Sequence, residues 1–275
     1  MAINFASKYS KQIQTAYVRE SLVAGRLSND YDFAGAKTVV VYTPQTVAMV
    51  DYTRSGSNRY GEPTEMQDTK QELTLSQDKS FALTIDKGNN ADQMNIKGAG
   101  KMLRLQMAEK AVPLFDKYVL GVLATKAGKI NTGAALTKST VCDRISDGTQ
   151  FLDDNEVPDS DRTLWVNAAT YKVLKHSDEF MAVERLAGKA IAKGEVGTYD
   201  NMTVIKVPAS RMPAGVNFII AHRNAATAPV KMHETKIHQD PPGISGHLIE
   251  GREYYDCFVF ETKKNGVYAD KTTSS

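Results

Sequence analysis

The sequence predicts an α+β fold, and three patterns along the chain indicate it. Apolar and polar residues alternate between residues 37 and 87, which is typical of β-strands. An apolar stripe at helical spacing follows over residues 91–127. Residues 128–225 then mix strand-like runs with helical segments, and strand patterning returns over residues 229–269. No internal repeat interrupts this order.

The composition is that of a folded globular chain. Of the 275 residues, 41% are hydrophobic and 24% are charged, and 34 basic against 32 acidic side chains give a formal net charge of +2. This balance argues against a dedicated, strongly basic nucleic-acid binder and against a polybasic membrane anchor. No apolar run approaches the ~18 residues of a membrane-spanning helix, so no membrane partner is expected. Two distant cysteines, Cys142 and Cys257, exclude a disulfide framework and are interpreted as buried small hydrophobes.

Residues 1–36 are predicted to form an N-terminal arm. Tyr9, Ile13 and Tyr17 recur at helical spacing and predict a short amphipathic helix near residues 8–24. Glycine and small polar residues then interrupt the pattern. Because so short a helix is marginal in water, it needs a partner surface.

Residues 37–90 are predicted to form an extended hairpin with flanking strands. Its first limb runs from Thr38 to Tyr52, and its return limb alternates as far as Ile85. The tip between them, residues 54–63, is rich in turn-forming residues. The segment that follows the tip is strongly polar, so the hairpin cannot build a core of its own and is expected to find a partner. The tip residues predicted to make contact are Arg54, Asn58, Arg59, Tyr60, Glu62 and Glu65.

Residues 91–127 are predicted to form one long helix that ends at Gly128. At ~1.5 Å per residue the helix would be roughly 50 Å long, which is longer than an ordinary domain needs. Pro113 lies inside it and should kink or divide it near Val112. We interpret this segment as a structural spine.

The second half of the chain is predicted to contain an α/β unit followed by closing strands. In the α/β unit, helices are expected after Thr140 and over residues 168–176 and 178–193, with strands at 163–167, 196–199, 202–207 and 217–221. The closing strands are expected at residues 230–238, 248–249, 254–261 and 267–269.

No catalytic, cofactor-binding or metal-binding residues are predicted, and the protein is expected not to be an enzyme. His233 and His238 superficially resemble a zinc motif, but they are five residues apart instead of four, and strand alternation sends them to opposite faces. The run Gly98-Ala99-Gly100-Lys101 lacks the first half of a phosphate-binding loop. Residues 243–247 lack a spacer of the nucleophile elbow.

The ordered segments resemble the major capsid proteins of tailed bacteriophages with the Hong Kong 97-like fold. The segments that carry the resemblance are the tip Gly56–Gly61, the returning strand Phe81–Lys87, the helix over 91–127, the strand pair Thr198–Pro208 and the closing segment Pro241–Asp256. The resemblance divides the chain into an N-terminal arm (1–36), an extended E-loop hairpin with flanking strands (37–90), the spine helix of the peripheral domain (91–134), an axial domain (135–225), and peripheral closing strands with a C-terminal tail (226–275).

The resemblance implies a structural protein that self-assembles into hexamers and pentamers of an icosahedral head shell. The shell would enclose double-stranded DNA without sequence specificity, and the hairpin tip and the arm residues Tyr9, Ile13 and Tyr17 would contact neighbouring subunits. The implied partners are a separate scaffolding protein, a portal protein and an optional decoration protein. The implied localisation is the virion, after assembly in the bacterial host cytoplasm. Two alternatives stay open: an encapsulin-like nanocompartment shell, and a soluble enzyme that would use His233, Glu234 and His238.

Overall fold

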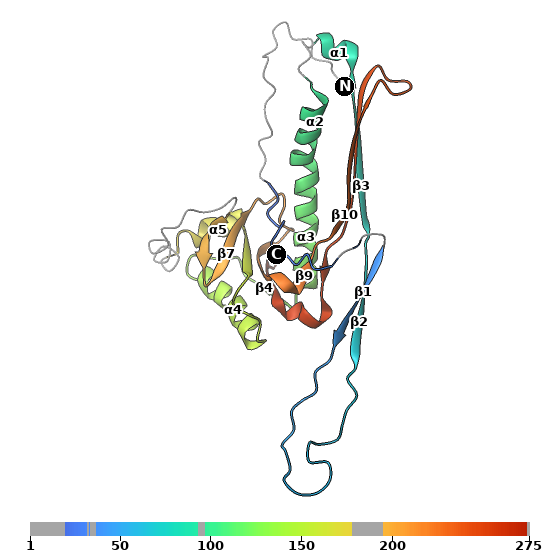
Figure 1. Cartoon of the computed structure of the whole chain (residues 1–275). Coiled ribbons are helices and arrows are strands. Elements are labelled where there is room, and N and C mark those ends of the chain that lie inside the picture. The colour runs from blue at the N-terminus through green and yellow to red at the C-terminus, as the bar shows by residue number, and fades with distance from the viewer. Residues whose placement is uncertain (1–19, 32, 34–36, 93–96, 178–194, 274–275) are drawn as a thin grey trace.

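The computed structural model describes residues 20–31, 33, 37–92, 97–177 and 195–273. The predicted arm residues Tyr9, Ile13 and Tyr17 and the predicted helix over residues 178–193 lie outside these ranges. The described chain forms an elongated molecule in which a long helix runs beside a narrow sheet, a hairpin projects beyond them, and a wider sheet lies to one side (Figure 1).

The described chain contains both helices and strands, as the predicted α+β class requires. The helices are α1 (Lys87–Asp92), α2 (Ala99–Gln106), α3 (Val112–Lys126), α4 (Val141–Asp154) and α5 (Ala168–Leu174), with a π-helical turn at Met107–Ala111 and 3-10 turns at Arg223–Ala225 and Glu261–Gly266. The strands are β1 (Thr38–Pro44), β2 (Asp68–Thr74), β3 (Gln77–Asp86), β4 (Lys129–Gly133), β5 (Arg162–Asn167), β6 (Glu195–Tyr199), β7 (Met202–Val207), β8 (Val216–His222), β9 (Ala226–Thr227), β10 (Val230–Gln239), β11 (Gly246–Tyr255), β12 (Phe258–Val259) and β13 (Val267–Thr272).

The predicted hairpin is present but shorter than expected. Strands β1 and β2 pair antiparallel from Thr38 opposite Thr74 to Pro44 opposite Asp68. The first limb therefore ends at Pro44 and does not continue as a strand to Tyr52; proline has no amide hydrogen to offer the ladder. Strand β3 leaves the hairpin and pairs with β11 in the three-stranded sheet β10-β11-β3.

The long helix also differs in detail from the prediction. It begins at Ala99, after an extended Gly98, and not at residue 91. The break expected near Val112 takes the form of a π-helical turn, in which the Val112 amide donates to the Met107 carbonyl, five residues back. Pro113 is the second residue of α3 and follows this turn directly; because it has no N–H, it cannot continue the hydrogen-bond ladder from the preceding turn. The helix ends at Lys126, two residues before Gly128 and close to the predicted end.

The wider sheet has six strands in the order β4-β13-β8-β5-β7-β6 and carries a core on each face. Ile219 of β8 points into the core shared with α3, whereas its neighbours Phe218 and Ile220 point into the core shared with α4 and α5. This alternation is the period-two pattern of a strand buried on both faces. Strand β13, predicted as one of the closing strands, lies inside this sheet between β4 and β8.

Candidate inter-subunit surfaces

The projecting loop between β1 and β2, residues 45–67, is the first candidate surface (Figure 1). Its limbs remain paired in places: the Gln45 amide donates to the Gln67 carbonyl at 2.8 Å, and the Thr53 amide donates to the Arg59 carbonyl at 3.1 Å. The turn that reverses the chain is left-handed at Asn58, with φ 58°, a conformation that asparagine tolerates.

Large apolar side chains in this loop lie in water. The side chain of Met49 is 99% exposed and that of Tyr60 is 84% exposed. Further apolar residues on the loop are also exposed: Val47, Val50, Tyr52 and Met66. Removing apolar surface from water is worth about 25 cal/mol per Å², so a covering partner would be strongly favoured.

Every tip residue predicted from the sequence is exposed in this loop. The six residues are Arg54, Asn58, Arg59, Tyr60, Glu62 and Glu65. The structure brings Asn58 and Glu62 together through a side-chain hydrogen bond, and Arg59 donates to the Gly56 carbonyl at 3.1 Å. The ring of Tyr60 packs edge-on against Tyr52 at 5.0 Å between centroids.

Apart from Tyr60, the sequence pattern does not single out the apolar residues of this surface. Val47, Met49 and Val50 follow the alternation of the first limb, which predicts a strand and gives them no role in contact. The flanking Pro44 and Pro63 carry the signal that could have identified an irregular loop, because neither can serve as a strand donor.

The described part of the predicted arm, from residue 20 onward, is fixed to the body of the same chain around a buried ion pair. Arg211 Nη1 lies 2.6 Å from Asp116 Oδ2, and the two side chains are 3% and 0% exposed. The same carboxylate accepts hydrogen bonds from Ser21 Oγ at 2.6 Å and from the Leu22 amide at 3.0 Å. Trp165 Nε1 donates to the Leu22 carbonyl at 3.0 Å. These contacts hold the start of the described chain between α3 and the six-stranded sheet.

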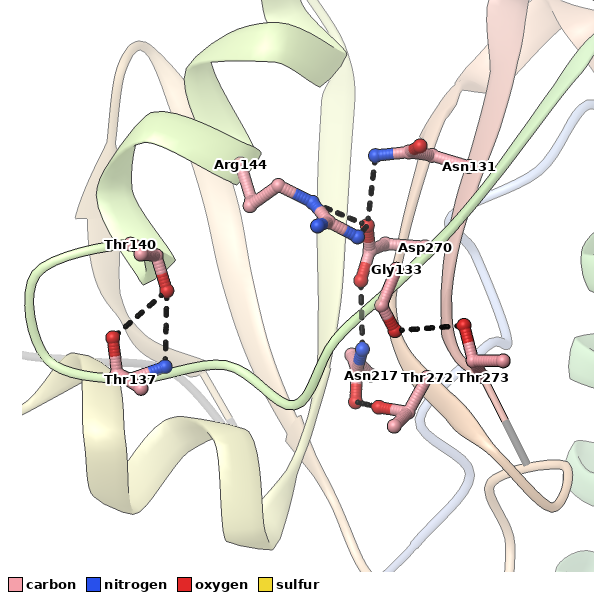
Figure 2. Close-up of polar contacts among 9 residues, drawn as sticks. All are labelled: Asn131, Gly133, Thr137, Thr140, Arg144, Asn217, Asp270, Thr272 and Thr273. Atoms are coloured by element: carbon pink, nitrogen blue, oxygen red, sulfur yellow. Dashed lines mark hydrogen bonds and ion pairs between the residues drawn. The ribbon is translucent and has the colours of Figure 1, made fainter. Parts of the chain in front are cut away.

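A second buried carboxylate, Asp270 of β13, holds that sheet together (Figure 2). Its Oδ2 accepts from Arg144 Nε at 3.0 Å, from Arg144 Nη2 at 2.6 Å and from Asn131 Nδ2 at 3.2 Å. Its Oδ1 accepts from Asn217 Nδ2 at 2.7 Å. Both oxygens thus accept hydrogen bonds from donors on α4, β4 and β8. This arrangement suits a carboxylate that connects structural elements and not one that acts as a general base.

The histidines that superficially resemble a metal motif do not converge. His233 Nδ1 lies 3.1 Å from a Glu253 carboxylate oxygen, and His238 Nε2 lies 3.2 Å from a Glu250 oxygen. Within the described ranges no group of three or more His, Cys, Asp or Glu side chains is placed to hold a metal ion. None of the helices in the described part of the chain is long and apolar enough to cross a membrane.

An apolar groove of about 430 Å³ lies beside the buried ion pair. It is bounded by the N-terminal segment, by α3 and by the start of β10, and its apolar lining includes Val23, Leu27, Phe33, Phe115 and Val230. It is a second apolar surface that the described residues leave open.

Comparison with known proteins identifies the architecture. No protein-family model matches the chain, and no curated protein matches it significantly. Solved structures match over nearly its whole length. A chain of Mycobacterium phage Che8 superposes with a TM-score of 0.71 at 17% identity, over 97% of both chains.

Two further matches are capsid structures. The mature capsid of bacteriophage PhiM1 gives a TM-score of 0.75 at 13% identity, over 98% of this chain and 92% of that one. The capsid of cyanophage P-SCSP1u gives a TM-score of 0.75 at 12% identity, over 98% of this chain and 94% of that one. The chain therefore has the fold found in these phage capsid structures.

Proposed function

We propose that this chain is the major capsid protein of a tailed bacteriophage with the Hong Kong 97-like fold, and that its copies form the head shell. The observation that carries the proposal is the projecting loop of residues 45–67. Its apolar side chains are exposed and belong to none of the hydrophobic clusters of the described chain, although burying them would be favourable. A loop of this kind suits a protein that is completed by its own copies.

In the proposed shell, hexamers and pentamers close into an icosahedron, and the loop of one copy lies on the next. The arm residues Tyr9, Ile13 and Tyr17 would add a second contact between subunits. The five parts inferred from the sequence, from the arm (1–36) to the closing strands (226–275), are the working division of the subunit. We further propose a structural role without catalysis in the virion, a separate scaffolding protein, a portal, an optional decoration protein, and packaged double-stranded DNA held without sequence specificity.

The proposal is tested by a substitution at the most exposed apolar side chain of the loop. Met49→Asp should leave the thermal unfolding of the isolated subunit unchanged, because the side chain is 99% exposed. It should prevent closed shells, because assembly would bury a charge against apolar surface. Met49→Leu keeps the apolar surface and serves as the matched control.

Negative-stain microscopy and sedimentation of the purified protein provide the measurement. We expect closed shells from the wild type and from Met49→Leu, and small oligomers from Met49→Asp. Shells formed equally well by Met49→Asp would contradict the role of the loop, and the absence of shells from the wild type under any assembly condition would contradict the function. Ultraviolet absorbance of shells purified from infected cells distinguishes packaged DNA from the enzyme cargo of an encapsulin-like compartment.

A further inference from the structure

The projecting hairpin is joined to the three-stranded sheet through two residues, Leu75 and Ser76. They lie between the end of β2 and the start of β3, where the chain passes from the hairpin to the body of the molecule. Any rotation of the hairpin relative to the sheet must therefore turn this joint.

Three backbone groups of the joint are hydrogen-bonded to other segments. The Leu75 amide donates to the Lys37 carbonyl at 3.1 Å, and the Leu75 carbonyl accepts from the Tyr254 hydroxyl at 3.1 Å. The Ser76 amide donates to Asp256 Oδ2 at 2.8 Å. The side chain of Leu75 is 1% exposed, so the joint is also packed on its apolar side.

Asp256 connects this joint to the long helix. Its Oδ1 accepts from the Tyr118 hydroxyl of α3 at 2.6 Å and from the Cys257 amide at 2.7 Å. Burial, followed by this hydrogen bond, raises the pKa of Tyr118 to about 12, so the hydroxyl keeps its proton and donates at neutral pH. One carboxylate thus holds the hairpin joint, the helix and the loop after β11 in a fixed relation.

Burying the Asp256 carboxylate carries a desolvation cost that packing alone would not offset. Asp256 is 4% exposed, and no Lys, Arg or His forms an ion pair with it in the described part of the chain. Burying such a charge is tolerated only when hydrogen bonds compensate it. Here the compensating donors come from three separate segments, so the buried carboxylate fixes how these segments are oriented relative to one another.

A second pair of bonds fastens the hairpin further along. Gln71 Nε2 of β2 donates to the Val259 carbonyl at 3.1 Å, and Gln71 Oε1 accepts from the Glu261 amide at 3.1 Å. Beneath them lies an apolar cluster that includes Val41, Leu73 and Phe260. The root of the hairpin is therefore held by hydrogen bonds and apolar packing, whereas the tip residues are exposed.

We propose that Asp256, through Tyr118 and the Ser76 amide, is a positioning residue that sets the angle of the hairpin to the long helix and thereby the curvature of the shell. The proposal rests on the shell-forming function above. The hairpin acts as a lever: Asn58 at the tip lies 18 residues from Ser76, at most about 60 Å of extended chain. A rotation of about 5° at the joint would move the tip by up to about 5 Å, well beyond the roughly 0.5–1 Å gap that apolar contacts allow.

Tyr118→Phe is the cleanest test, because it removes one hydroxyl and leaves the hairpin's own bond to Asp256 intact. Asp256→Asn is the stronger variant, since the amide group can no longer offer an acceptor on both sides. Tyr255→Phe is the matched control: its ring packs on Phe115 and Tyr118, at 5.1 Å and 5.8 Å between centroids, but no hydrogen bond joins its hydroxyl to Asp256.

The readout is the distribution of shell diameters in electron micrographs, with subunit unfolding temperature measured in parallel. We expect the wild type and Tyr255→Phe to give one diameter, and Tyr118→Phe and Asp256→Asn to give several diameters or open, unclosed sheets. A merely structural role would lower the unfolding temperature and the yield while every closed shell kept the wild-type diameter, and that result would overturn the proposal. A wild type that forms no shells fails the function itself, so the two failures are distinguishable.

Discussion

Removing Arg211 should destabilise the fold strongly, because its partner Asp116 is entirely buried. In Arg211→Met the carboxylate keeps its bonds from Ser21 and Leu22 but loses its positive partner at 2.6 Å. An uncompensated buried charge of this kind costs about 3–5 kcal/mol, out of a total stability of about 5–15 kcal/mol. For a chain of this size each kcal/mol lowers the unfolding temperature by about 2–4 °C, so we expect a fall of about 6–20 °C.

A second substitution should restore part of this loss. In the double variant Asp116→Asn/Arg211→Met the charge is gone, while the oxygen of the substituted amide side chain can still accept from the Leu22 amide. The double variant should therefore unfold at a higher temperature than Arg211→Met alone.

Thermal unfolding of the purified protein at low concentration, followed by circular dichroism, measures both effects. Lys70→Met, which breaks an exposed ion pair with Glu72, is the control and should leave the unfolding temperature unchanged. The reasoning is refuted if Arg211→Met unfolds with the wild type, or if the double variant is less stable than the single one.

Burial and backbone geometry support three more predictions. Gly246→Ala should destabilise the fold by about 1–3 kcal/mol, because φ is +136° and a Cβ would overlap the β3 backbone. Gly100→Ala, in an open helical position, should stabilise the fold by about 0.5–1 kcal/mol. Urea titrations measure both changes in the free energy of unfolding. Burial lowers the pKa of His222 from 6.5. The neutral imidazole therefore stabilises the fold above pH 6.5, and this contribution is lost as the pH falls through the lowered pKa. Between about pH 7 and pH 4, the urea midpoint of His222→Gln should fall less than that of the wild type. Cys142 and Cys257 are buried, and burial raises the pKa of the Cys257 thiol, so neither should react with a thiol reagent until urea unfolds the chain.

Local patterns in the sequence predict most elements but not their partners. The alternation through Phe81 and Leu83 indicates a strand, yet the same alternation suits pairing with β1 or with β11. Which strand β3 pairs with depends on Leu75 and Ser76, because hydrogen bonds from residues about 180 positions away hold the backbone of these two residues. In the long helix, by contrast, the break at Pro113 is a local property of proline and was predictable.

The sequence predicts where the candidate surface lies along the chain, but not which apolar residues are exposed on it. Turn-forming residues located the tip, and the polar contacts at Asn58 and Arg59 fall within it. The exposure of Met49 could not be predicted, because exposure depends on which residues the rest of the chain covers. The ion pair between Asp116 and Arg211 joins residues 95 positions apart, and no local spacing points to it.

The place of β13 in the six-stranded sheet has a consequence for synthesis. This strand, residues 267–272, fills the gap between β4 and β8, and its Asp270 gathers the donors of three other elements. A chain that is still being translated lacks β13. Strand β4 then has no neighbour in the sheet, and Arg144 lacks its ion-pair partner Asp270. Because chains emerge N-terminus first, the sheet is completed only when nearly the whole described chain has left the ribosome. Nascent and prematurely terminated chains would thus carry an unfinished six-stranded sheet.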